Sequence, residues 1–435
     1  MMLRLAFALI CLALPLRAEV PIQSVTSPGG ITAWLVEAHE IPFAALEIRF
    51  RGGTSLDAPG KRGAVNLMTA LLEEGADDLD AQGFAEARDD LAADFRFRAS
   101  TDALSVSTRM LTENRDKAVE LLRSALLTPR FDPDALERVR GQVLSGIRSD
   151  AKDPQALAGQ VFDAAAFGAH PYGSSGDGSL ESVAALTRDD ILAAYKGALV
   201  RDQLYVAAVG DITAEDLGLL LDRLLGDLPA SGAALPGRAE WQLGGGVTVQ
   251  DFPTPQSVVV FGHQGIERDD PDFFAAFILN EILGGGRFSA RLMTEVREKR
   301  GLTYGVSTYL APMDHAETMM GQFSADNAKA AEAIGIVQAE WAKLATEGVT
   351  EAELAATKTY LTGSYPLRFD GNGPIANILV GMQMQGLSID YATTRNAQIE
   401  AVTLDDVARV AKRLLLPESL HFVVVGQPTG LEPGN

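Results

Sequence analysis

LTRDDILAAYKGALVRDQLYVAAVGDIT (residues 186–213) recurs in altered form as VTLDDVARVAKRLLLPESLHFVVVGQPT (residues 402–429). The copies align without a gap, and each begins with a threonine followed by acidic residues, which is typical of a capped helix start. An amphipathic stretch follows, and then an apolar run rich in β-branched residues that ends at glycine, which predicts a strand. The identities include Thr187 with Thr403, Asp190 with Asp406, and Gly210 with Gly426. The chain is therefore predicted to be an internal duplication.

The beginnings of the two halves correspond as well. FAALEIRFRGG and QSVVVFGHQG predict strands, and the helical stretches GAVNLMTALLEEGA and DFFAAFILNEILGGG follow them. Strands separated by long helical segments predict an α+β fold of two homologous domains, each a mostly antiparallel sheet covered by helices. A stretch rich in Ala, Gly and Pro predicts a linker at 231–245, between an N-terminal domain at 19–230 and a C-terminal domain at 246–435.

The first 18 residues have the pattern of an export signal. Arg4 precedes the apolar run LAFALICLALPL (5–16), which is too short to span a bilayer, and Ala18 supplies a small residue for cleavage. Cys11 is the one cysteine and lies inside this run, so the mature chain would have neither thiol chemistry nor disulfides. We expect an exported, periplasmic or otherwise extracytoplasmic protein without a membrane span once the signal is removed.

The composition is that of an ordinary globular protein. Of the 435 residues, 47% are hydrophobic and 22% are charged, and the formal net charge is −21. A nucleic-acid-binding protein needs a basic surface that displaces counterions, so this charge argues against a nucleic-acid partner.

Three segments resemble a known family. ILGGGRFSARLMTEVREKRGLTYGVSTY (282–309), HPYGSSGDGSLESVAALTRDDI (170–191) and LYVAAVGDI (204–212) are similar to segments of the pitrilysin/insulinase family of zinc peptidases. The resemblance is greatest to the short two-domain members, which include mitochondrial processing peptidase subunits and bacterial homologues. It covers nearly the whole mature chain.

The zinc motif of that family is missing from this sequence. Catalytic members carry H-x-x-E-H on the first long helix, where two histidines four residues apart bind zinc and the glutamate is the general base. The matching positions here are Asn66, Thr69 and Ala70, and Gly146 or its neighbour Ser145 replaces a later glutamate ligand. The adjacent Glu73 and Glu74 point in different helical directions, and no two of the five histidines lie within one helical turn. We predict no zinc in this chain and expect it in a partner subunit.

The resemblance assigns a role to Arg297 and Tyr304. In the family, an arginine and a tyrosine at this spacing line the substrate chamber. A guanidinium can hold a peptide carbonyl or carboxylate, and a phenol can donate to an oxygen on which negative charge develops. From the residues alone, Arg297 could equally complement a helix dipole and Tyr304 could pack in a sheet. We expect Glu298, Lys299 and Arg300 to be solvated or paired at the surface.

Other residues near these motifs have structural interpretations. The glycines at 284–286 predict a turn of close backbone approach. His170 precedes a proline, and we expect it to satisfy local backbone groups. Arg287, Ser289 and Arg291 fit either a wall of the chamber or a capped, solvated helix.

The sequence therefore predicts the non-zinc subunit of an exported heterodimeric zinc peptidase, inactive alone and active with an H-x-x-E-H partner. Peptides or unfolded chains would be its substrates. Two alternatives stay open. One is a pseudo-peptidase that binds or scaffolds peptides without cleavage. The other is a self-sufficient enzyme that uses residues such as His170 or Glu74.

Overall fold

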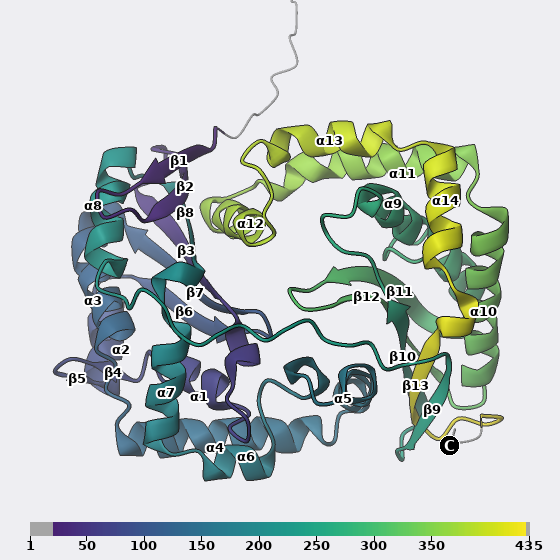
Figure 1. Ribbon diagram of the computed structural model, residues 1–435, viewed down its shortest axis with the longest axis horizontal. Helices are drawn as coiled ribbons and strands as arrows, with labels where there is room; N and C mark the ends of the chain where they lie inside the picture. The colour runs from purple at the N-terminus through teal and green to yellow at the C-terminus, as the bar shows by residue number, and fades with distance from the viewer. Residues whose placement is uncertain (1–20, 432–435) are drawn as a thin grey trace, which may run out of the picture.

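The computed structural model describes residues 21–431, so the predicted signal peptide at 1–18 lies outside the described residues. The chain forms two halves, each built on its own β-sheet, and the sheets face one another across the molecule (Figure 1). Helices cover the sheets, and antiparallel pairs predominate within them. The predicted α+β class is confirmed.

The N-terminal sheet has six strands in the order β1-β2-β8-β3-β7-β6. These strands are β1 (Gln23–Thr26), β2 (Thr32–Glu37), β8 (Leu204–Gly210), β3 (Phe43–Arg51), β7 (Ala103–Leu111) and β6 (Asp94–Ala99). Neighbours are antiparallel except β2 and β8, which are parallel. A separate pair consists of β4 (Gly75–Ala76) and β5 (Leu79–Asp80).

The C-terminal sheet has five strands in the order β11-β12-β10-β13-β9. These strands are β11 (Thr303–Pro312), β12 (Glu317–Asp326), β10 (Gln256–Gln264), β13 (His421–Gly426) and β9 (Gly246–Asp251). Again one pair is parallel, β13 with β9, and the others are antiparallel.

The strand order confirms the duplication. Read from the parallel pair, the sheets run β2-β8-β3-β7-β6 and β9-β13-β10-β12-β11, with the same orientation at each step. The sequence repeat forms α7 (Arg188–Ala198) with β8 and α14 (Leu404–Leu414) with β13, and Thr187 and Thr403 each form the predicted capping box. A Cβ on Gly210 would lie 2.3 Å from a backbone oxygen of β3, and one on Gly426 would lie 2.5 Å from a side chain of β10. Both repeats therefore need the glycine for close strand approach.

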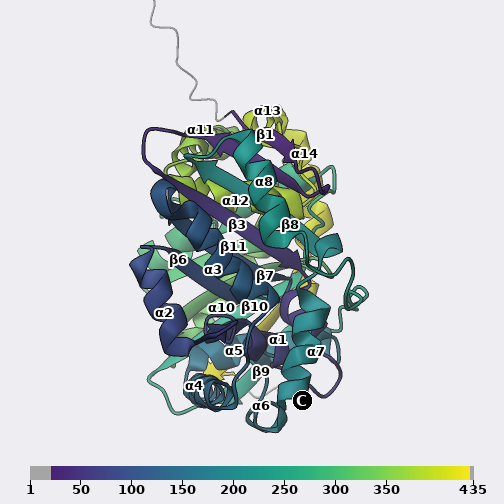
Figure 2. The same ribbon diagram turned by 90° about the vertical axis from the view of Figure 1, so that its left-hand side faces the viewer.

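Helices cover the outer face of each sheet (Figures 1 and 2). In addition to α7, the N-terminal half has α1 (Ala64–Ala70), α2 (Ala81–Asp90), α3 (Arg115–Leu127), α4 (Pro133–Asp150), α6 (Leu180–Ala185) and α8 (Ala214–Leu225). The C-terminal half has α9 (Phe273–Leu283), α10 (Ala330–Glu347), α11 (Glu351–Ser364), α13 (Tyr391–Ala401) and α14. The short elements are the 3-10 turns η1 (Gly53–Leu56), η2 (Thr112–Asn114), η3 (Pro171–Gly173), η4 (Arg201–Gln203), η6 (Tyr365–Arg368) and η7 (Pro417–Ser419), and the π-helix η5 (Met293–Glu298).

Two helices are exchanged between the halves. α12 (Asn372–Met384) belongs to the C-terminal half in sequence, but its apolar side chains pack on the inner face of the N-terminal sheet. α5 (Pro154–Phe167) makes the reciprocal contact with the inner face of the C-terminal sheet through residues such as Phe162. Both helices lie between the two sheets in Figure 1. The exchange buries apolar surface between the halves and fixes their relative position.

Residues 226–245 contain neither helix nor strand, and the predicted linker at 231–245 lies in this stretch. It runs across the molecule from one half to the other (Figure 1). No helix within residues 21–431 combines the length and apolar character needed to cross a bilayer.

Candidate functional site

The helix that would carry the zinc motif is α1, and its three motif positions hold no ligand set. Asn66 donates from Nδ2 to Oδ1 of Asp177 at 2.9 Å, and this hydrogen bond connects α1 to the segment before α6. Thr69 is 1% exposed, and its hydroxyl donates to the carbonyl oxygen of Val65 at 2.7 Å. Ala70 offers only a methyl group. These donors cannot replace two imidazoles and a carboxylate.

The fourth motif position and the nearby carboxylates do not complete such a site. Gly146 is exposed on α4, and a Cβ there would meet nothing within 4 Å, so the position is open yet carries no donor. Glu73 pairs with Arg88 at 3.3 Å, and Glu74 pairs with Arg138 on α4 at 2.7 Å. Within residues 21–431, no group of three or more His, Cys, Asp or Glu side chains could hold a metal ion. The residues present do not fit zinc.

His170 has a structural role, as its sequence context predicted. Its Nδ1 accepts from the backbone N–H of Tyr172 at 3.2 Å, and its Nε2 donates to the carbonyl oxygen of Gly237 at 3.0 Å. The Tyr172 hydroxyl in turn donates to Asp102 at 2.6 Å and accepts from the backbone of His315 at 3.0 Å. Both imidazole nitrogens are therefore used in a contact network that joins the two halves. This leaves His170 without a lone pair for general-base catalysis.

Arg297 and Tyr304 lie on two irregular elements. Arg297 is in the last turn of the π-helix η5, and its guanidinium carbon lies 4.6 Å from the centre of the exposed Phe288 ring. Tyr304 follows at the start of β11, where the register with β12 shifts between Thr303 and Val306. The extra residue in β11 is a β-bulge, which redirects side chains. Tyr304 is consequently 85% exposed, so it is not packed in the sheet.

The cations beside this pair have other partners. Lys299 and Arg300 form ion pairs with Glu295 at 2.5 and 2.8 Å, as expected of a surface cluster. Arg291 makes a two-pronged contact with Glu353 on α11, at 2.7 and 2.8 Å. That contact ties Arg291 to the fold.

The residues next to Arg291 have structural partners too. Arg287 donates to the hydroxyl of Thr357 at 2.8 Å, while its guanidinium carbon lies 4.7 Å from the ring centre of Tyr360. A Cβ on Gly284 would lie 2.6 Å from Thr308, which confirms the predicted close approach of the glycine turn.

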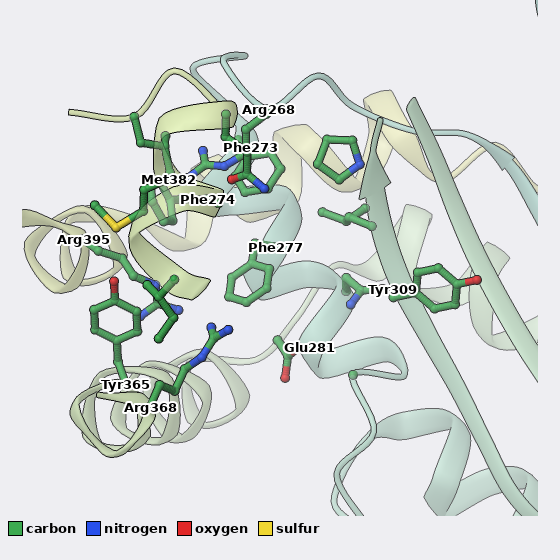
Figure 3. Close-up of a pocket in the computed structure, with 18 of the residues that line it drawn as sticks. Arg268, Phe273, Phe274, Phe277, Glu281, Tyr309, Tyr365, Arg368, Met382 and Arg395 are labelled. Atoms are coloured by element: carbon green, nitrogen blue, oxygen red, sulfur yellow. The ribbon is translucent and has the colours of Figure 1, made fainter. Parts of the chain in front are cut away.

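A cavity of about 650 Å³ opens between α9, α12, α13 and β11 (Figure 3). Neither Arg297 nor Tyr304 lines it. Its charged residues are Arg49, Arg268, Glu281, Arg368 and Arg395. None of these residues could be singled out from the sequence, because they lie far apart in the chain. They come from β3, the segment before α9, α9 itself, η6 and α13. Burial is the main reason that the pKa of Glu281 is raised and that of Arg395 lowered.

Comparison with known families gives two matches along the chain. The family model described as insulinase (peptidase family M16) matches residues 33–176. The model described as the peptidase M16 inactive domain matches residues 185–361. The first match contains α1 with Asn66, Thr69 and Ala70, and the second contains Arg297 and Tyr304.

Individual relatives span nearly the whole chain. The non-peptidase homolog YmxG of Helicobacter pylori is 26% identical over 390 residues, covering 89% of this chain and 90% of its own length. An uncharacterized zinc protease of Mycobacterium leprae is also 26% identical, over 407 residues, covering 90% of this chain and 88% of its own length. Relatives named as proteases and as a non-peptidase thus resemble the chain to the same degree.

Solved structures agree with the fold. The crystal structure of a peptidase M16 inactive domain from Pseudomonas fluorescens has a TM-score of 0.88 and 29% identity, covering 95% of this chain and all of that one. A protease from Helicobacter pylori has a TM-score of 0.84 at 19% identity, covering 93% of this chain and 99% of its own, which supports the fold alone.

Proposed function

The chain belongs to the M16 family of insulinase-like peptidases, and we propose that it is the zinc-less subunit of an exported heterodimeric zinc peptidase. In this proposal Arg297 and Tyr304 act in the active site of a homologous partner that carries H-x-x-E-H. The chain is inactive alone, because Asn66, Thr69, Ala70 and Gly146 supply no ligand set for the metal.

The observation that carries the proposal is the local geometry around Arg297 and Tyr304. A π-helix and a β-bulge occur within a dozen residues of each other, and each holds one of the two side chains. π-helices are rare and frequent at functional sites, and bulges re-aim side chains next to active sites. The result is a cation and a phenol at the surface, with Tyr304 almost fully exposed in this chain. An exposed aromatic of this kind fits a group that meets a substrate or a second subunit.

The chemistry of the pair suits a peptide bond undergoing hydrolysis. The Arg297 guanidinium can hold a substrate carbonyl or carboxylate through paired N–H donors. The Tyr304 hydroxyl can donate to the carbonyl oxygen as it gains negative charge. Zinc bound by the partner would supply the Lewis acid and the activated water. Substrates are peptides or unfolded chains, which would add as a strand to a sheet edge of the catalytic partner.

A second function is a pseudo-peptidase that binds or scaffolds peptides without cleavage in any complex. The name of the Helicobacter pylori relative, a non-peptidase homolog, favours it. The two proposals differ in one measurable respect, since only the first requires hydrolysis by an assembled pair.

The test is co-purification combined with a peptide hydrolysis assay. The tagged chain is expressed alone and together with the H-x-x-E-H homologue encoded in the same genome. We expect a stable complex that hydrolyses an unstructured peptide, while the lone chain does not. A complex without hydrolysis would favour the binding protein, and failure to form any complex would contradict the heterodimer.

A further inference from the structure

One cavity of this acidic protein has more arginines than carboxylates in its wall. The chain has a formal net charge of −21, yet the cavity beside α9 has four arginines and a single carboxylate, Glu281, in its wall. Its volume of about 650 Å³ is in the range of ligand sites in proteins. An excess of positive charge inside low-dielectric walls concentrates its field in the cavity and attracts anions.

The arginines of this cavity form no ion pair within the described part of the chain, although Glu281 lies near enough to Arg395, and Glu47 to Arg49, for their charges to interact. Arg395 is 6% exposed, and its Nη1 donates only to the carbonyl oxygen of Leu361 at 3.3 Å and to Oδ1 of Asn396 at 3.1 Å. Arg268 instead lies over aromatic rings, with its guanidinium carbon 4.3 Å from the ring centre of Phe273. Among residues 21–431, none of Arg49, Arg268, Arg368 and Arg395 has a carboxylate within ion-pair distance. Of the four, Arg395 is buried, Arg49 and Arg268 are half-buried, and Arg368 is exposed. A buried cation without a counter-ion is costly, so an anionic ligand would gain most from pairing with Arg395.

A second hollow continues this surface along the open part of the N-terminal sheet. Its volume is about 710 Å³, and β3, β6 and β7 line it with Arg96, Arg98 and Arg109. Two carboxylates, Glu47 and Asp94, share this lining, and Asp94 pairs with Arg96 at 3.2 Å, so the arginines of this hollow outnumber its carboxylates but are partly neutralised. Both hollows share Arg49 and Asn377, and the Arg49 guanidinium donates to Oδ1 of Asn377, so the hollows meet at this pair between β3 and α12. α12 covers the apolar strands of this face and leaves the polar strands uncovered.

The arginines come from separate elements, and the aromatic wall between them indicates the shape of the ligand. Figure 3 shows Arg268, Arg368 and Arg395 on separate elements around the cavity, with Phe274 and Phe277 between them. Glu281, in the same wall, would repel a compact anion of high charge. Carboxylates distributed along an extended chain, with apolar side chains between them, match both the charges and the aromatic wall.

We propose that the two hollows form one continuous binding site for acidic peptide segments, in which Asp, Glu or terminal carboxylates pair with Arg268, Arg368, Arg395 and Arg49. The inference takes from the proposed function only that the ligand is a peptide. It names a ligand class for these two hollows, peptides rich in carboxylates, which the zinc-motif positions and the Arg297–Tyr304 pair do not define.

The experiment measures peptide binding by the full-length chain without any partner. The probe is a fluorescein-labelled peptide of alternating aspartate and phenylalanine, and its match has every aspartate replaced by asparagine. Anisotropy titrations at low and high ionic strength give the two affinities. We expect the acidic peptide to bind at least about tenfold more tightly, with the difference shrinking in salt as charge screening increases.

Variants locate the site. Arg268→Gln with Arg368→Gln should weaken binding of the acidic peptide about tenfold or more, because each loses a charge-assisted hydrogen bond. The control is Arg148→Gln with Lys343→Gln, which removes the same charge from exposed positions on α4 and α10. Thermal unfolding confirms that both double variants are folded. Equal affinity for the two peptides, or an equal loss in the control, would overturn the proposal.

This result is independent of the proposed enzymatic role. The titration needs neither zinc nor a second subunit, so a failed heterodimer would leave it unaffected. Conversely, equal binding of the two peptides would leave the predicted roles of Arg297 and Tyr304 unchanged, because those roles are measured by turnover in the pair.

Discussion

Replacing Tyr304 by phenylalanine isolates one hydroxyl group. The side chain is 85% exposed on the bulge of β11, and its ring packs in neither core of the described chain. Surface substitutions away from buried contacts change the free energy of unfolding by about 0.5 kcal/mol or less. Tyr304→Phe should therefore leave folding and subunit assembly intact, and any kinetic effect can be assigned to contact with substrate.

The size of the effect follows from the bond that is lost. A hydrogen bond to a charged group contributes about 1.5–3 kcal/mol, and every 1.36 kcal/mol on the barrier is a factor of ten in rate. If the hydroxyl donates to the developing oxyanion, kcat of the assembled pair should fall about 10- to 150-fold. KM should change little, because the interaction strengthens in the transition state.

The assay is steady-state hydrolysis of a quenched fluorescent peptide by the reconstituted pair, with gel filtration to verify assembly. Lys299→Gln is the matched control, since it removes a neighbouring side chain whose ion pair with Glu295 is at the surface. Such a pair contributes about 0.3–0.5 kcal/mol and no catalysis. If Tyr304→Phe matches the wild-type pair in both kcat and KM, the assigned role of the phenol is wrong.

Three further results are expected. Arg297→Gln should lower kcat/KM of the pair about tenfold or more, because the substrate loses the paired N–H donors of the guanidinium. The free energy of unfolding should fall by less than about 1 kcal/mol, since the half-buried guanidinium stacks only on the exposed ring of Phe288. Unfolding curves and kinetics together check this, and a large stability loss would indicate a structural role. Leu379→Ala, in the exchanged helix α12, should reduce the free energy of unfolding in urea by about 2–5 kcal/mol, because it leaves a cavity under the helix. The control is Leu219→Ala, at a 60% exposed leucine of α8, which should change the free energy of unfolding by about 0.5 kcal/mol or less. Similar losses in the two variants would refute the packing of α12 on the N-terminal sheet. The hydrogen bond from Arg291 is the main cause that lowers the pKa of Glu353 from 4.5 to about 2. The ionised Glu353 therefore stabilises the fold fully above pH 4.5, and this stabilisation is lost as the pH falls towards 2. In urea unfolding, Glu353→Gln should be less stable than the wild type by about 1–2 kcal/mol at neutral pH and should lose less stability in acid, whereas an unchanged acid profile would contradict the pairing.

Much of the fold followed from local chemistry that the sequence shows directly. Thr187 and Thr403 with their aspartates predict two capped helices, and the glycine after each strand marks the same close approach in both halves. The absence of the zinc ligands could also be predicted, since two histidines at i and i+4 on one helix would be visible in the sequence. His170 followed the expectation for a histidine before proline.

Other features depend on long-range packing. The apolar faces of α5 and α12 predict burial but not which sheet buries them, so their exchange could not be derived. The bulge that exposes Tyr304 is one extra residue in β11, visible only against its partner strand. The expected helix at 63–76 ends at Ala70, because the chain turns there and Gly75 enters β4 with φ of 117°. The arginine cavity unites segments far apart in sequence, and no local pattern marks it.

The central claim is that the active site is divided between two chains. Its most direct test is to measure bound zinc and peptide hydrolysis on the same three samples: this chain, the H-x-x-E-H homologue, and the purified complex of both. We predict zinc in the homologue and in the complex, none in this chain, and efficient hydrolysis by the complex alone. Zinc together with hydrolysis in the lone chain would contradict the account, and so would a homologue whose activity is unchanged by adding this chain.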